Sequence, residues 1–150
     1  VLKVEWGTVN SKWRNAKDQS VSDDLPKSEI RGFKDLEVWQ VSMRLVRICY
    51  DLTKGFPESE RFGLTNQLRR SAVSVPSNIA EGHGRGSQKS FLQFLWIANG
   101  SLAELETQII LAVDLKFVPL DGAAECIELV HQVGRMLTGL RRSIERSLQS

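Results

Sequence analysis

Apolar residues recur every three or four positions in four segments of the chain, and each such pattern predicts an amphipathic helix. The clearest segment begins after Ser87, a suitable helix cap, and ends before Pro119. Its packing seam, with alternating steps of four and three, comprises Phe91, Leu95, Ala98, Leu102, Leu105, Ile109 and Ala112. The last segment begins at another predicted cap, Asp121, and its seam comprises Cys126, Val130, Val133, Leu137, Leu140 and Ile144. Together the four patterns predict an all-α fold, an antiparallel up-down four-helix bundle.

The first predicted helix carries apolar residues on two sides. It should begin at the N-cap Asp35 and run to about Lys54, before Gly55. The stripe expected to face the core comprises Leu36, Trp39, Met43, Val46 and Tyr50, and the second stripe comprises Val38, Val41, Leu45, Ile48 and Leu52. A helix with two apolar sides buries both. The second stripe therefore indicates a subunit interface, and a single wide core face is the alternative.

The second predicted helix contains an internal proline. It should start near Glu58 or Phe62 and end at Glu81, and its core face comprises Leu64, Leu68, Ala72, Val75 and Ile79. Pro76 lies inside this apolar pattern. Because proline lacks an N–H group and its ring clashes with the preceding turn, we expect a kink in this helix.

Polar residues and glycines lie at the expected end of this helix. Gly82 and Gly84 predict the helix stop, and residues 83–86 are interpreted as a turn because they lack a complete phosphate-binding pattern. Asn78 and Glu81 then occupy the last turn, where a carboxylate meets the negative end of the helix dipole and needs a partner. We interpret both as members of a buried structural hydrogen-bond network. A ligand-binding or catalytic carboxylate is the alternative.

The third predicted helix adds two residues to this structural polar network, Ser101 and Glu104. Gly100 lies in the middle of the helix, where it costs about 1 kcal/mol relative to alanine. We therefore expect it to allow a close approach of a neighbouring helix beside Ser101. Glu104 is predicted to form an ion pair with Arg69 or Arg70 across the bundle.

Composition is that of an ordinary globular domain. The chain has 150 residues, of which 41% are hydrophobic and 25% charged. No apolar run reaches the length of a transmembrane helix. Cys49 and Cys126 are too widely separated for a zinc site or disulfide framework, so we interpret them as reduced core thiols of a cytoplasmic protein. Residues 1–32, without sustained periodicity, are predicted to be a flexible arm before a bundle domain of residues 33–150.

Several short motifs resemble those of one known family. They are FKDLEVW at residues 33–39, FP at 56–57, QLRR at 67–70, SVPSNIAEG at 74–82 and GSLAELET at 100–107. Over roughly residues 33–145 the chain is similar to bacterial four-helix bundle proteins, which include proteins encoded in intervening sequences of large-subunit ribosomal RNA genes. The same family includes the accessory variability protein of diversity-generating retroelements.

The resemblance implies an assembly and partners. Members of this family form homopentamers, and the retroelement accessory protein works with nucleic acid and a reverse transcriptase. The charge of this chain is nearly balanced, since residues 33–150 hold 14 Lys and Arg against 13 Asp and Glu. Nucleic-acid binding is driven largely by cations that replace phosphate counterions. Any binding to RNA or DNA must therefore come from a local basic patch.

We therefore predict a non-catalytic oligomeric protein, encoded in or near a ribosomal RNA intervening sequence, that binds nucleic acid through such a patch. The candidate contacts are Arg69, Arg70, Arg85, Lys89, Arg141, Arg142 and Arg146. Cations at the end of the last helix are also favoured by its dipole alone, and a protein-interaction scaffold is the alternative function. His83 and His131 lack partners at metal-ligand spacing, and no catalytic or cofactor motif is found.

Overall fold

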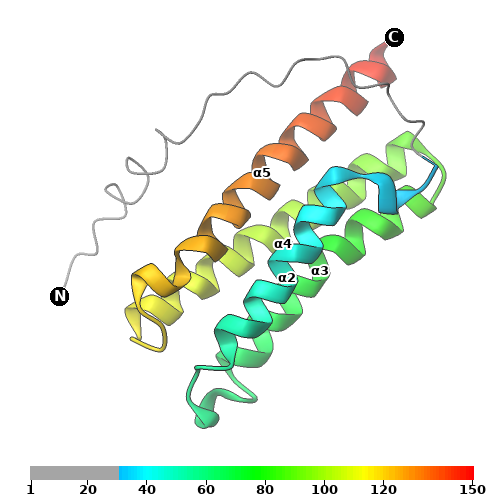
Figure 1. The fold of residues 1–150 in the computed structure, drawn as a ribbon. Coiled ribbons are helices and arrows are strands. Elements are labelled where there is room, and N and C mark those ends of the chain that lie inside the picture. The colour runs from blue at the N-terminus through cyan, green and yellow to red at the C-terminus, as the bar shows by residue number, and fades with distance from the viewer. Residues whose placement is uncertain (1–30) are drawn as a thin grey trace.

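The computed structural model describes residues 31–150, which form four long helices with short connections. In chain order the elements are the 3-10 turn η1 (Phe33–Asp35), α2 (Glu37–Thr53), the 3-10 turn η2 (Glu58–Glu60), α3 (Leu64–Gly84), α4 (Gln88–Asp114) and α5 (Leu120–Gln149). Successive helices run in opposite directions along the bundle (Figure 1). The predicted all-α four-helix arrangement is confirmed for these residues. The homopentamer stays a prediction, and nearly all of the predicted arm, residues 1–30, lies outside the described residues.

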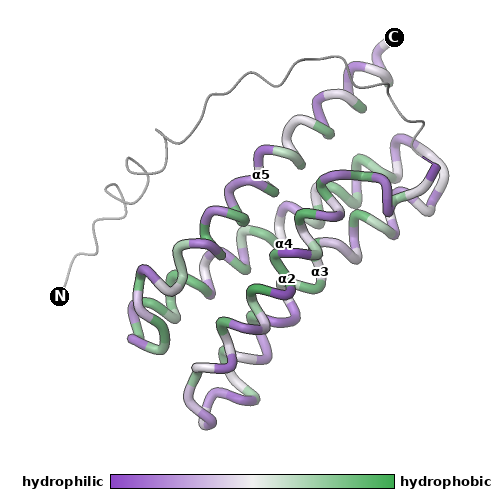
Figure 2. Tube along the Cα trace, viewed as in Figure 1, coloured by the Kyte–Doolittle hydropathy of each residue, from purple (hydrophilic) through white to green (hydrophobic). Residues whose placement is uncertain are grey.

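The predicted seams of α4 and α5 lie at the centre of the core. Leu95, Leu105 and Ile109 of α4 and Val133 and Leu137 of α5 have 0% of their surface exposed. Polar and apolar positions alternate along each helix at helical spacing (Figure 2). Burying one such side chain contributes roughly 1.5–3 kcal/mol. These two seams therefore supply a large part of the stability that holds the helices together.

The core face of α2 differs from the prediction. Its buried residues are Val38, Ser42, Leu45, Cys49 and Thr53. Ser42 and Thr53 donate their hydroxyls to main-chain carbonyls three or four residues earlier, at 2.8 and 2.9 Å, so burial leaves neither hydroxyl unpaired. These polar residues interrupt the apolar pattern on the true core face, which is why the sequence favoured the other stripe. The assignment of Leu45 to a subunit interface is wrong, because its side chain is fully buried in the core.

The stripe predicted to be the α2 core face borders the buried face: Leu36 is buried, and Trp39 and Val46 pack half-buried against the core. Trp39, Met43 and Val46 are half-buried, and Tyr50 is 41% exposed. Phe33 of η1 packs edge-on against Trp39, with ring centres 5.4 Å apart. Val41, Ile48 and Leu52 of the second stripe also pack against the core, so α2 has the single wide core face that was the alternative, with Tyr50 at its exposed edge.

Two of the three predicted helix caps lie elsewhere. The Asp35 carboxylate accepts hydrogen bonds from the main-chain N–H groups of Arg31 and Gly32, so it caps the short turn η1. The cap of α2 is the next residue, Leu36. Asp121 lies in the first turn of α5, after the cap Pro119, whose φ of −70° suits a helix start. The third prediction is confirmed, since Ser87 Oγ accepts a hydrogen bond from the Ser90 N–H.

Two glycines have the opposite roles from those predicted. Helix α3 continues through Pro76 and past Gly82 to Gly84, so Gly82 does not end it. A Cβ atom at Gly82 would lie 2.5 Å from Cβ of Phe94, so this glycine is the point where α3 and α4 approach closely. At Gly100, by contrast, a Cβ atom would have no neighbouring atom within 4 Å. In the connection between α3 and α4, Gly86 adopts a positive φ of 73°, a conformation that suits glycine.

Helix α4 ends in a hydrogen-bonding pattern that the sequence did not indicate. Lys116 adopts a positive φ of 60°, and its N–H donates to Val113 O over 3.0 Å. The next N–H, that of Phe117, donates to Ala112 O over 2.9 Å. These two bonds are those of a Schellman motif, in which glycine is the usual residue with positive φ. The motif turns the chain toward α5 over a short connection.

Candidate nucleic-acid interface

The seven cations predicted to contact nucleic acid lie in two regions of the bundle. Arg69 and Arg70 belong to the N-terminal half of α3. The second group lies near the other end, where the connection from α3 to α4 lies beside the end of α5 (Figure 1), and comprises Arg85, Lys89, Arg141, Arg142 and Arg146. Along α3, Arg70 and Arg85 are separated by about 22 Å. One compact patch therefore cannot contain all seven residues.

Arg69 is held by contacts with α2. Its Nε donates to Thr53 Oγ1 over 2.8 Å, and its guanidinium lies 4.6 Å from the centre of the Tyr50 ring. Arg70 is exposed and lines a cavity of about 360 Å³ that Glu104 also lines. The ion pair predicted between Glu104 and either arginine is not formed, and the Glu104 carboxylate instead accepts a long hydrogen bond of 3.5 Å from Ser71 Oγ. Arg69 therefore has a structural role.

Arg85 is neutralised by a neighbour on its own helix. Its guanidinium pairs with the Glu81 carboxylate over 2.7 Å and lies 5.2 Å from the centre of the Phe94 ring. Lys89 is exposed on the first turn of α4 and has no carboxylate within 4 Å in the described part of the chain. Only Lys89 of this pair thus remains available to a polyanion.

Arg141 is buried, although it lies among exposed cations. Only 8% of its surface is exposed, and its guanidinium carbon lies 3.6 Å from the centre of the Trp96 ring. Its Nη2 donates to Thr138 Oγ1 over 3.2 Å, whereas Nε and Nη1 have no hydrogen-bond partner among residues 31–150. A buried cation without a carboxylate is costly. Arg141 therefore packs against Trp96 and is not available to a ligand in solvent.

Three exposed arginines form a row along one face of α5. Arg142 was predicted as a contact, as was Arg146, and Arg135 lies seven residues before Arg142 on the same face. We call these three residues the α5 arginine stripe. Within the described residues none has a carboxylate within 4 Å. Arg135, Arg142 and Arg146 are seven and four residues apart, and this helical spacing is the feature of the sequence that could have identified Arg135.

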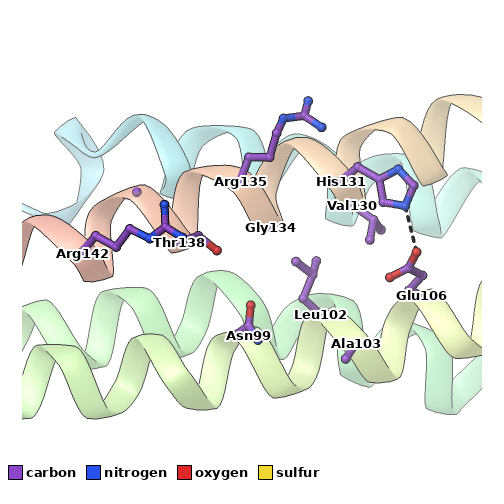
Figure 3. A pocket seen from close by; sticks show the side chains of 11 residues that line it. Asn99, Leu102, Ala103, Glu106, Val130, His131, Gly134, Arg135, Thr138 and Arg142 are labelled. Atoms are coloured by element: carbon purple, nitrogen blue, oxygen red, sulfur yellow. Dashed lines mark hydrogen bonds and ion pairs between the residues drawn. The ribbon is translucent and has the colours of Figure 1, made fainter. Parts of the chain in front are cut away.

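A groove between α4 and α5 runs beside this stripe (Figure 3), with a volume of about 730 Å³. Its lining combines apolar, small and polar side chains: Asn99, Leu102, Ala103, Glu106, Val130, His131, Gly134, Arg135, Thr138, Gly139 and Arg142. Arg142 and Thr138 lie at one end, opposite Asn99, and a hydrogen bond of 2.8 Å between His131 Nε2 and Glu106 Oε1 closes the other end. The groove was not predicted from sequence, because it depends on which sides of α4 and α5 face each other.

The predicted polar network is only partly assembled. Asn78 Nδ2 donates to the carbonyl and hydroxyl oxygens of Ser74, at 2.8 and 2.9 Å, and Ser74 Oγ lies 2.8 Å from Ser101 Oγ. Asn78 and Ser101 are thus connected through a serine that the sequence did not single out. Glu104 is exposed, and so is Glu81, which pairs with Arg85. The interpretation of Glu81 as a buried group is wrong, because α3 continues beyond it and presents it to solvent.

The two cysteines are free and buried, as interpreted from sequence. The structure adds that they face each other across α2 and α5. A hydrogen bond with Cys126 and burial raise the pKa of the Cys49 thiol far above its ordinary value of 9.0. Among residues 31–150, no group of three or more His, Cys, Asp or Glu side chains could hold a metal ion.

These observations define a helical bundle protein with an arginine stripe, unpaired within residues 31–150, beside a groove of mixed apolar and polar lining. None of its helices within residues 31–150 has an apolar stretch that would span a bilayer. The chain belongs to the 23S rRNA-intervening sequence protein family, whose model matches residues 34–139. The family assignment made from the sequence motifs is confirmed.

One solved structure with this fold is that of a protein with unknown function from the S23 ribosomal protein family of Bacteroides thetaiotaomicron, with a TM-score of 0.62. The two chains are 22% identical, and the alignment covers 69% of this chain and 97% of the other. At this identity the likeness shows the fold alone. The chain matches no curated protein.

Proposed function

We propose that this chain is a non-catalytic protein that binds nucleic acid through the α5 arginine stripe, Arg135, Arg142 and Arg146. The observation that carries the proposal is that these three exposed arginines share one helix face and have no carboxylate within 4 Å in residues 31–150. Arginine forms bidentate hydrogen bonds with phosphate oxygens. A row of such groups along a helix therefore suits the repeating charge of a nucleic-acid backbone.

Self-association would strengthen binding by this weakly charged chain. With a net charge of +2, a single copy has little long-range attraction for a polyanion. A homo-oligomer, for which we propose a pentamer, repeats the stripe around a symmetry axis, and a long polyanion that contacts several copies gains avidity. The family name supports a gene within a 23S ribosomal RNA intervening sequence.

The test is binding to a labelled structured RNA and to duplex DNA at two salt concentrations. The variant R135A/R142A/R146A removes the stripe, and R44A/R47A/R61A removes the same charge from exposed positions on α2 and beside η2. We expect the first variant to bind at least tenfold more weakly and to show a shallower dependence on salt, since each lost phosphate contact lowers the slope by about one. Equal losses in both variants, or no binding by the natural chain at low salt, would overturn the proposal.

A second candidate function, a protein-interaction scaffold, is favoured by two exposed apolar residues on α2 and α3. Tyr50 is 41% exposed and Val73 is 40% exposed, and both line one cavity of about 510 Å³ whose other lining residues are polar. Exposed apolar surface of this kind commonly marks a protein contact. The same surface suits contacts between copies of this chain, so the scaffold and the nucleic-acid proposals are separated by the binding test and not by oligomeric state.

A further inference from the structure

Trp96 is an exposed aromatic residue whose orientation is fixed by a buried cation. It retains 54% of its surface exposed, although the Arg141 guanidinium lies 3.6 Å from its ring centre. Arg141 is itself positioned by its bond to Thr138 and by burial. Because one face of the indole lies against the guanidinium, the accessible surface is the opposite face and the ring edge. A large flat apolar surface is thus held open beside the groove.

The surroundings of Trp96 on α4 are polar and cationic. Asn99, Ala103 and Glu106 of α4 line the groove, and Trp96 lies one helical turn before Asn99, beside the groove lining. Across the groove lie Thr138 and Arg142 of α5 (Figure 3). Asn99 and Thr138 offer hydrogen-bond donors and acceptors, and Arg142 offers a positive charge that no carboxylate of residues 31–150 pairs with.

The apolar residues on the other side of α4 are separate from this site. Ile97, Glu104 and Leu111 follow at steps of seven, and they lie on the side of Ser101, which contacts Ser74 of α3. Ile97 is 45% and Leu111 44% exposed. Trp96 therefore lies at the edge of the groove between α4 and α5, where its ring contacts Arg141 of α5.

We infer that this groove binds an unpaired strand of RNA, with one base stacked on the free face of Trp96. The adjacent phosphates then contact Arg142 and, about 10 Å further along α5, Arg135. Base stacking on an aromatic side chain is tolerant of sequence, and it needs a base that is not already stacked in a duplex. This inference rests on the proposed function, to which it adds the class of nucleic acid and the residue that selects it.

The experiment compares a 12-nucleotide single-stranded RNA with a hairpin that contains the same sequence paired. We expect the natural chain to bind the single strand more tightly. Trp96→Leu should weaken that binding by about five- to one-hundredfold and leave hairpin binding nearly unchanged, while Trp96→Phe, which keeps an aromatic face, should retain most of it. Phe62→Leu is the matched control, because Phe62 is 86% exposed and also lies against an arginine, Arg61. It should have no effect.

A direct measurement keeps the inference testable if Trp96→Leu fails to fold. The chain has four tryptophans, so phenylalanine at Trp6, Trp13 and Trp39 leaves Trp96 as the single fluorophore. Its fluorescence should be quenched by the single strand and far less by the hairpin.

Three results would overturn the inference. The first is equal affinity for the single strand and the hairpin, and the second is an unchanged preference for the single strand in Trp96→Leu. The third is a changed molecular mass of Trp96→Leu, which would place Trp96 between subunits. If the stripe variant still loses RNA binding in these cases, the proposed function stands. Absence of all RNA binding would remove both.

Discussion

The Sγ atoms of Cys49 and Cys126 lie 3.4 Å apart in the core, where they join α2 to α5 through a thiol hydrogen bond. Both side chains have 0% exposure. The hydrogen bond with Cys126 and the loss of hydration raise the pKa of Cys49, because both disfavour the thiolate. The pair is thus a polar contact inside an apolar core, and it makes stability depend on pH.

Stability should fall as the pH rises above the ordinary thiol value of 9.0. Above that pH an unfolded Cys49 loses its proton while the folded one keeps it, so the folded state binds more protons and is progressively disfavoured. Well above it the free energy of unfolding should fall by about 1.4 kcal/mol per pH unit. Urea unfolding at pH 8 and pH 10 measures this loss. Cys49→Ala should show a smaller loss over the same interval, and identical losses would contradict the prediction.

The two helical glycines should respond in opposite directions to alanine. Gly82→Ala should destabilise the protein by more than about 1 kcal/mol, because the added methyl group overlaps Phe94 in α4. Gly100→Ala should stabilise it by about 0.5–1 kcal/mol, since the site is open and alanine is the better helix former. Thermal unfolding of the two variants checks both signs, and a stabilised Gly82→Ala would refute the close approach of α3 and α4.

Asn78 and Glu81 should differ in their importance for stability. Asn78→Ala removes both hydrogen bonds to Ser74 and should cost about 1 kcal/mol. Glu81→Ala removes a pair whose side chains are 51% and 56% exposed, and exposed pairs of this kind contribute little, so the change should stay within about 0.5 kcal/mol. Chemical denaturation of the two variants measures the difference. Equal costs would show that Glu81 has a buried role after all.

The exposed residues Tyr50 and Val73, between α2 and α3, should take part in the contact between copies. Val73→Asp places a charge where a second copy would bury an apolar side chain and should lower the molecular mass measured by light scattering, because burying a charge is costly. Phe62→Asp introduces the same charge at an 86% exposed residue elsewhere and should leave the mass unchanged. An unchanged mass in Val73→Asp would contradict this interface. Leu45→Asp would not test assembly, because Leu45 is fully buried and the change should unfold the core.

The sequence predicted the helices well because long apolar seams on α4 and α5 have one interpretation. It was less successful for α2, where Ser42 and Thr53 occupy core positions that main-chain hydrogen bonds make tolerable. Sequence spacing cannot show such bonds. The cap of α2 was mispredicted for a similar reason. Asp35 lies next to two helical turns, η1 and the start of α2, and its carboxylate caps η1, the shorter one.

The candidate site was only partly predictable. Arg142 and Arg146 were found from charge at the end of a helix, and the spacing to Arg135 was visible in the sequence. The burial of Arg141 and the exposure of Trp96 were not, because both depend on the contact between α4 and α5. Arg141 and Arg142 therefore received the same interpretation, although Arg141 is buried and Arg142 is exposed.

The place of α5 in the chain order has a consequence for synthesis. Because synthesis proceeds from the N-terminus, the ribosome completes α2, α3 and α4 before it makes Arg135, Arg142 and Arg146. A nascent chain therefore lacks one wall of the groove throughout most of its translation. If the groove binds RNA, a partly made chain cannot capture the transcripts and ribosomal RNA around it, and that activity first arises when translation of α5 is complete.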